Sequence, residues 1–268
     1  MHAWYTHRSP PRGCNLPDSP TLYLSSTANV WPHSPGYVLN LAFHPKSFTD
    51  DNIGTVLDAV AASSAANNTV VALWGDHGWQ LGEHGAWCKQ TMWEIATRGA
   101  LMISSPTLRP ASRVTGALVE FVDIYPTLAD LSGLAVPGPC PVAGADLVTA
   151  CTDGVSLKPL WASPAAELHP AALSLYPRPS MNQIQSMGYS MVIRVAGAEY
   201  RYTEWVKIRL EDAGSQVYTK LWAQNLGTEL YNHSASGFGW SDLENVNIAA
   251  THPALVATFS ATLRALWA

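Results

Sequence analysis

The sequence predicts an α/β domain followed by a smaller α+β domain, and three patterns carry that prediction. Residues 69–74 and 100–104 are apolar, partly β-branched runs of the kind that form buried strands. Residues 121–131 have a helical pattern and follow both runs, so strand and helix succeed one another as in an α/β layer. Residues 190–206 carry alternating β-forming side chains around Gly197, which predicts an antiparallel hairpin.

Composition divides the chain into three parts. Residues 1–46 are rich in proline, serine and aromatic residues without a sustained period, so we expect an irregular leader. Residues 47–163 carry the α/β pattern. Residues 164–268 carry the hairpin and a final helical pattern, so they are expected to form the smaller α+β domain.

The expected elements follow in order. A helix should begin near Thr49, because Asp50 and Asp51 suit the positive end of a helix, and should end between Ser63 and Asn68. The strand at 69–74, a short turn or helix at 93–96 and the strand at 100–104 come next. In the helix at 121–131, Pro126 places the start near Tyr125. The smaller domain should add a strand at 229–231 and a helix at 253–267.

Length and charge limit the classes of function. The chain has 268 residues, of which 47% are hydrophobic and 13% charged, which is typical of a globular protein. Its formal net charge of -5 argues against broad contact with nucleic acid. Its apolar runs are all shorter than the roughly 20 residues that span a bilayer, and its start lacks a signal-peptide core.

The cysteines and two short triplets bear on the compartment. Cys140 and Cys151 bracket a short loop, and this spacing permits either a disulfide or two unpaired thiols. Asn67 and Asn232 each begin a triplet of the N-glycosylation type. Both features favour an oxidising compartment, although no signal peptide is visible.

Residues 76–89, DHGWQLGEHGAWCK, hold the strongest functional signal because they directly follow the expected strand at 69–74. Sites in open α/β sheets lie beyond the carboxyl ends of strands. There, the Asp76 carboxylate and the His77 imidazole can hold a metal ion. The chain can bring Lys89 back to the same place, where its ammonium group can bind an anion. The alternatives are a turn or cap for the Asp-His pair and an exposed surface residue for the lysine.

These residues resemble the second metal-binding motif of the sulfatases, in the alkaline phosphatase superfamily, and most specifically that of the iduronate-2-sulfatase group. Other segments carry the same resemblance in the same order: residues 47–58, 121–128, 176–179, 187–190, 200–205 and 227–233. Residues 1–46 carry no such resemblance, so we expect them to lie outside the family. The resemblance implies a partial sulfatase-like sheet with flanking helices. Residues 47–163 would then be the C-terminal half of the catalytic domain, and residues 164–268 its small subdomain with antiparallel strands.

The resemblance also implies a chemistry. It implies a sulfuric ester hydrolase for sulfated sugars, with Ca²⁺ held by Asp76 and His77 and with Lys89 contacting the sulfate as a catalytic residue. A zinc site made of His77, Glu83 and His84 is an alternative, although Glu83 and His84 are expected to be structural. The candidate substrate-binding residues are Trp79, Arg98 and Arg178. Core packing is the alternative for Trp79, and a surface ion pair is the alternative for Arg178.

The same family implies a lysosomal or secreted protein with a disulfide between Cys140 and Cys151. One departure from the family is the absence of the C/S-x-P-S-R motif whose first residue becomes formylglycine, since Cys14 lacks the Ser-Arg pair. The early acidic metal ligands are also missing. Cys88 is expected to be an inert packed thiol. We therefore expect a chain without its N-terminal half, inactive alone and weak in calcium binding.

Two other functions remain open at this point. A non-catalytic sulfatase-like protein could bind sulfated glycans or a partner, and another hydrolase of the superfamily could act on phosphate esters. Residues 176–179 and 200–205 favour the sulfatase over the phosphate-ester hydrolase.

Overall fold

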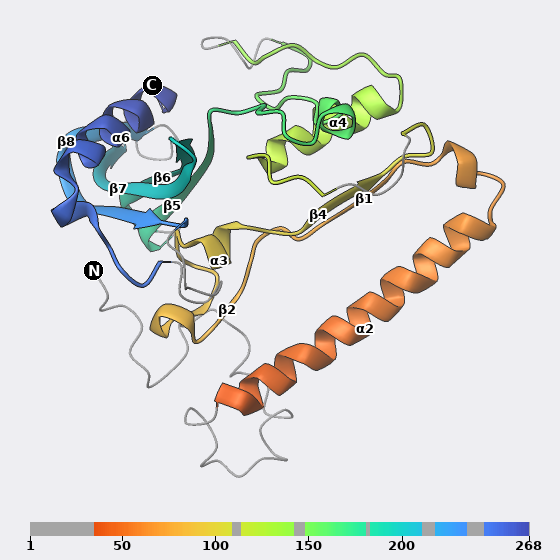
Figure 1. Ribbon diagram of the computed structural model, residues 1–268, viewed down its shortest axis with the longest axis horizontal. Helices are drawn as coiled ribbons and strands as arrows, with labels where there is room; N and C mark the ends of the chain where they lie inside the picture. The colour runs from red at the N-terminus through yellow and green to blue at the C-terminus, as the bar shows by residue number, and fades with distance from the viewer. Residues whose placement is uncertain are drawn as a thin grey trace.

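The computed structural model describes residues 35–108, 114–141, 148–180, 183–210, 218–234 and 244–267 (Figure 1). Residues 1–34, which include Cys14 and most of the expected leader, lie outside the described residues. The described part combines helices with short strands in its first half and a four-stranded antiparallel sheet in its second half. None of its helices is both long enough and apolar enough to cross a membrane.

The first helix, α2, spans Pro35–Ala62, and most of its length extends away from the other described helices and strands in Figure 1. Its start precedes the expected one at Thr49, so the prediction of an irregular segment is wrong for residues 35–46. A proline suits the first helical turn because its missing N–H has no partner there in any case. Side chains such as Phe48 and Val56 remain largely exposed, so this helix has little packing in the described part.

Both strands expected in the first half are present, as β1 (Val71–Trp74) and β4 (Leu101–Ser104). They pair with each other in the antiparallel direction, with Val71 opposite Ser104 and Trp74 opposite Leu101. The described residues therefore contain no parallel sheet. The intervening chain forms a hairpin of β2 (Gln80–Leu81) and β3 (Trp87–Cys88) and then α3 (Glu94–Thr97), which turns it back along β1.

The next helix is α4, which spans Ile124–Leu131 after a 3₁₀ turn at Phe121–Asp123. Its start agrees with the one expected near Tyr125. The buried Asp123 carboxylate accepts hydrogen bonds from Val155 N at 2.8 Å and from Glu120 N at 2.8 Å, and it pairs with His169 at 2.8 Å. These contacts tie α4 to the segment that enters the second half of the chain.

The second half is an antiparallel sheet in the order β5 (Ala171–Ser180), β6 (Gln183–Val195), β7 (Ala198–Leu210) and β8 (Tyr218–Asn232). The expected hairpin is confirmed as β6 and β7. Its turn residues Ala196 and Gly197 have φ of 51° and 80°, and two positive φ values suit a tight hairpin.

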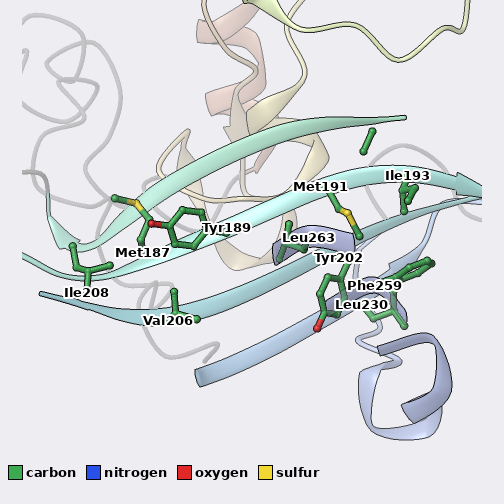
Figure 2. Packing of buried hydrophobic residues seen from close by; sticks show 11 residues of the cluster. Met187, Tyr189, Met191, Ile193, Tyr202, Val206, Ile208, Leu230, Phe259 and Leu263 are labelled. Atoms are coloured by element: carbon green, nitrogen blue, oxygen red, sulfur yellow. The ribbon is translucent and has the colours of Figure 1, made fainter. Parts of the chain in front are cut away.

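One face of this sheet is covered by α6 (Pro253–Leu266), as the helical pattern predicted. Phe259 and Leu263 of α6 are buried against sheet residues that include Met191, Tyr202 and Leu230 (Figure 2). Five such side chains, each with at most 1% of its surface exposed, make this sheet and helix the main hydrophobic core of the described chain.

The expected disulfide between Cys140 and Cys151 is present, with the two Cα atoms 4.8 Å apart. It closes a short loop between α4 and α5 (Pro159–Ala162), just before the chain enters the second half.

Candidate functional site

The structure brings together the three residues at the centre of the sequence prediction. Asp76 and His77 follow β1, whose end is held beside β4 because Gly75 N donates to Ala100 O at 2.9 Å. The exposed Asp76 carboxylate lies 3.2 Å from His77 Nε2 through Oδ2. Lys89 Nζ hydrogen-bonds the same His77 nitrogen. A carboxylate, an imidazole and an ammonium group therefore meet at one point at the end of β1.

The hydrogen bonds of His77 define which ring nitrogen is available. Nδ1 lies 2.7 Å from Gly78 O, and a carbonyl can only accept, so Nδ1 carries the proton. In the neutral ring the lone pair is then on Nε2, the atom that faces Asp76 and Lys89. Metal-binding imidazoles commonly use this arrangement, in which a backbone carbonyl orients the ring through its other nitrogen.

A tight hairpin returns Lys89 to this point. Gly82 and Gly85 have φ of 123° and 69°, a region that glycine adopts without strain. The Glu83 carboxylate accepts a hydrogen bond from Leu81 N at 2.6 Å, and the His84 ring lies 4.4 Å from that of Trp93. Glu83 and His84 thus hold the loop. The zinc alternative gains no support, because no three His, Cys, Asp or Glu side chains among the described residues could hold a metal ion.

The helix α3 contacts the backbone of the loop directly after His77. Gly78 N donates to Ala96 O at 2.9 Å. A Cβ atom at Gly78 would lie only 1.9 Å from Ile95 O and 2.9 Å from Arg98 O. The loop that carries His77 can therefore approach α3 only because residue 78 is a glycine.

The three candidate substrate-binding residues lie around this loop with different partners. Trp79 is 39% exposed and stacks on His77, with ring centroids 6.0 Å apart. The Arg178 guanidinium donates to Gln90 O at 2.7 Å and lies over the rings of Tyr176 and Trp205 at 4.8 and 5.1 Å. It therefore reaches the loop from the second half of the chain.

Arg98 has a different setting. Its Nη1 lies 3.3 Å from Glu94 Oε1, one helical turn earlier. It lines an open cavity of about 450 Å³ together with Glu94, Ile95, Gly99 and Ala100. Arg98 thus pairs with Glu94 of α3.

The prediction of a free thiol at Cys88 is wrong, because Cys88 is disulfide-bonded. Only 1% of its surface is exposed, and its partner lies outside the described residues. The even number of cysteines in the chain was the signal that could have indicated a second disulfide.

Sequence reasoning also missed a buried cluster beside α3, formed by Arg201, Glu94, Glu244 and His233. Arg201 is 2% exposed, pairs with Glu94 through Nη2 and donates from Nε to Glu244 Oε1 at 2.7 Å. His233 Nε2 lies 2.8 Å from Glu244 Oε1, and Nδ1 lies 3.2 Å from Glu199 Oε1. We refer to these four residues as the Arg201 cluster.

Charge pairing dominates the electrostatics of this cluster. Burial lowers the pKa of His233, but the carboxylates of Glu199 and Glu244 outweigh burial and raise it to about 9. The hydrogen bond from His233 lowers the pKa of Glu199 to about 2. The pKa of Glu244 is lowered as well, because Arg201 and His233 outweigh its burial. The imidazolium and the guanidinium therefore face ionised carboxylates.

A known family model matches most of the first half of the chain. The model of the sulfatase family matches residues 13–134. The match begins at residue 13, so the expectation that residues 1–46 lie outside the family is wrong for residues 13–46.

Curated relatives extend the similarity. The chain is 35% identical over 208 residues to iduronate 2-sulfatase of Mus musculus and 33% identical to that of Homo sapiens, with 61% of this chain and 37% of each relative covered. It is 48% identical over 88 residues to a sulfatase of Formosa agariphila, with 33% of this chain and 17% of the relative covered. The chain thus spans little more than a third of the length of the iduronate 2-sulfatases that it matches.

Solved structures support the fold alone. The phosphonate monoester hydrolase from Silicibacter pomeroyi superposes with a TM-score of 0.57 at 23% identity, covering 80% of this chain and 37% of that one. A second structure, described as a complex with its substrate D-glucosamine-2-N,6-O-disulfate, gives a TM-score of 0.53 at 23% identity, covering 80% and 38%.

Proposed function

We propose, on the premise that this chain belongs to the sulfatase family, that it contributes the metal- and sulfate-binding side of a sulfuric ester hydrolase site of the iduronate-2-sulfatase type. The observation that carries this proposal is the convergence of Asp76, His77 and Lys89 at the end of β1. We further propose that residues 47–163 are the C-terminal half of the catalytic domain and residues 164–268 its small subdomain.

The donors present fit part of a calcium shell. Asp76 offers carboxylate oxygens and His77 offers Nε2, and these two donors lie 3.2 Å apart. Calcium prefers six to eight oxygen ligands, so the remaining ligands must come from outside this pair. When bound, the cation would stabilise negative charge on the sulfuryl oxygens. We assign Asp76 and His77 as its protein ligands in the described chain.

Lys89 and the neighbouring residues suit the sulfated substrate. The Lys89 ammonium is a compact point charge that can contact a sulfate oxygen from any direction. Trp79 offers a partly exposed indole beside His77, suited to the apolar face of a sugar. Arg178 donates a hydrogen bond to the backbone of Gln90, the residue after Lys89. Arg98 pairs with Glu94 of α3. Both arginines are candidates for recognising substrate anions.

Turnover requires a nucleophile whose precursor motif is absent from these 268 residues. Family members use formylglycine made from the first residue of C/S-x-P-S-R, and that motif does not occur among the 268 residues. A metal and a lysine stabilise charge but form no covalent intermediate. We therefore propose that this chain alone binds metal and anion without hydrolysing sulfate esters.

We propose that the substrate is a sulfated saccharide and that the protein resides in an oxidising compartment. The Cys140–Cys151 disulfide indicates an extracellular or lumenal protein, and resemblance to iduronate 2-sulfatases points to the lysosome or to secretion. Of the two glycosylation triplets, Asn67 is exposed, whereas Asn232 Oδ1 accepts a hydrogen bond from Ser234 N at 2.8 Å.

A second candidate is a sulfatase-like protein that binds sulfated glycans or a partner without catalysis. The convergence of Asp76, His77 and Lys89 in a chain that lacks the formylglycine motif favours it. Hydrolysis of phosphate esters is the third candidate; the similarity to the phosphonate monoester hydrolase bears on the fold and does not distinguish the substrate.

An NMR titration of residues 76–89 tests the proposal. We expect saturable Ca²⁺ binding with a Kd of about 10⁻³ M, the weak end of protein calcium sites, and sulfate binding that requires Ca²⁺. Asp76→Ala and His77→Ala should abolish Ca²⁺ binding, whereas the exposed Asp58→Ala should not. Lys89→Met should keep Ca²⁺ binding and lose sulfate, with Lys207→Met as the matched control. Unchanged Ca²⁺ binding in Asp76→Ala would refute the metal assignment.

A further inference from the structure

The Arg201 cluster joins three distant segments of the chain at one guanidinium. Arg201 lies on β7, and its Nη2 contacts Glu94 at the start of α3 and Thr97 Oγ1 at 2.9 Å. Its Nε donates to Glu244, and its Nη1 donates to Ser190 Oγ on β6 at 3.2 Å. Glu244 also accepts a hydrogen bond from Glu94 N at 2.6 Å, so both the side chain and the backbone of Glu94 are held.

The helix α3 is the link between this cluster and the candidate metal ligands. It adjoins the sheet of the second half on one side in Figure 1. Through Ala96 O and the Ile95 carbonyl it also touches Gly78, the residue after His77. A Cβ atom built at Gly78 would lie 1.9 Å from Ile95 O, so the two backbones pass close to each other. We therefore expect a shift of α3 to shift the backbone at His77 and Gly78.

We propose that Arg201 is a positioning residue for the Asp76–His77–Lys89 site, because it fixes α3 through Glu94 and α3 in turn fixes the backbone of His77. The inference rests on the proposed function for what the site binds. The positioning itself depends only on the contacts from β7 through α3 to Gly78.

The chemistry of arginine explains why this residue type occupies the position. Its partners require donors in three directions from one rigid plane, which a guanidinium provides and an ammonium does not. Burial of two carboxylates beside a single lysine nitrogen would leave part of their hydrogen-bonding capacity unused. Arg201→Lys should therefore retain the charge but loosen α3.

Amide hydrogen exchange tests the positioning without reference to catalysis. In Arg201→Met and Arg201→Lys, we expect the Gly78 amide, which donates to Ala96 O, to exchange at least tenfold faster relative to the amides of β6 and β7. A merely structural role would raise exchange at all of these amides together. In the same variants the Kd for Ca²⁺ should rise at least fivefold.

Arg264→Met is the matched control, because Arg264 also pairs with a buried carboxylate, Glu204 at 3.0 Å, but from α6. It should leave the ratio of Gly78 exchange to sheet exchange unchanged. Should Arg201→Met fail to fold, Arg201→Lys and Glu94→Gln decide the matter. A uniform rise in exchange with an unaltered Gly78 ratio would overturn the proposal. If the unmodified chain binds no Ca²⁺, the proposed function fails, and the exchange ratio still decides the positioning.

Discussion

Asp76, His77 and Lys89 were identifiable at the scale of single residues because they lie within one short stretch after a recognisable strand. A contiguous motif needs no knowledge of tertiary structure. Arg201, Glu94 and Glu244 were not identifiable, because they contact one another only when β7, α3 and a distant turn come together in the fold. In the sequence each of them is an ordinary charged residue that surface exposure would explain equally well.

The charge state of His233 predicts a pH dependence of stability. Its folded pKa of about 9 lies above the ordinary 6.5, so its stabilisation is complete below pH 6.5 and is lost as the pH rises through 9. The free energy of unfolding should therefore be about 2–3 kcal/mol higher at pH 5.5 than at pH 9.5. Urea denaturation should show this difference. His233→Gln should remove most of it, and the exposed His252→Gln should not; equal pH slopes in the two variants would contradict the assignment.

Glu199 sets the lower pH limit of this stabilisation. Because its pKa is lowered to about 2 from 4.5, its stabilisation is present above pH 4.5 and is lost as the pH falls through 2. The stabilisation by this ion pair is thus greatest between about pH 4.5 and 6.5.

Gly78→Ala tests the contact between the loop and α3. The added methyl group meets the Ile95 carbonyl, so the free energy of unfolding should fall by about 1–3 kcal/mol, as for other overpacking substitutions. Gly54→Ala is the control, since no atom lies within 4 Å of its Cβ position. It should not lower stability. Calorimetry of both variants checks the prediction; equal effects would show that the loop accommodates the methyl group.

At the scale of secondary structure, periodicity predicted the types of elements better than their bounds or pairing. The hairpin of β6 and β7, the helix α6 and the strands β1 and β4 all lie where they were expected, although β1 and β4 are only partly buried and not buried as predicted. The start of α2 differed because a strong capping signal at Thr49 does not exclude helix before it. The antiparallel pairing of β1 with β4 depends on how the intervening loop folds, which hydrophobic periodicity does not report.

The Cys140–Cys151 disulfide is an element-level constraint with a measurable contribution. Its sequence separation of 11 closes a short loop, so the chain-entropy account gives a stabilisation of about 2–3 kcal/mol. The double variant Cys140→Ala/Cys151→Ala should lose that much in urea denaturation, while Thr149→Ala in the same loop should lose little. Recovery of the two cysteines as separately alkylated thiols in peptide mapping of the unmodified chain would exclude the bond.

At the scale of the whole molecule, the absent nucleophile motif governs the expected activity. The purified 268-residue chain should hydrolyse an aryl sulfate no faster than its Asp76→Ala variant, because metal and lysine cannot replace a covalent nucleophile. A fluorogenic aryl sulfate assay with added Ca²⁺ measures this. Robust turnover that disappears in Asp76→Ala would falsify the prediction.

A crystal structure of this chain grown with Ca²⁺ and sulfate would test the central claim most directly. Our account predicts a cation bound by Asp76 and by Nε2 of His77, with a carboxylate oxygen at about 2.3–2.6 Å, and a sulfate ion in contact with Lys89 Nζ. A cation bound elsewhere, or Asp76 and Lys89 on opposite sides of the β1–β4 pair, would contradict it.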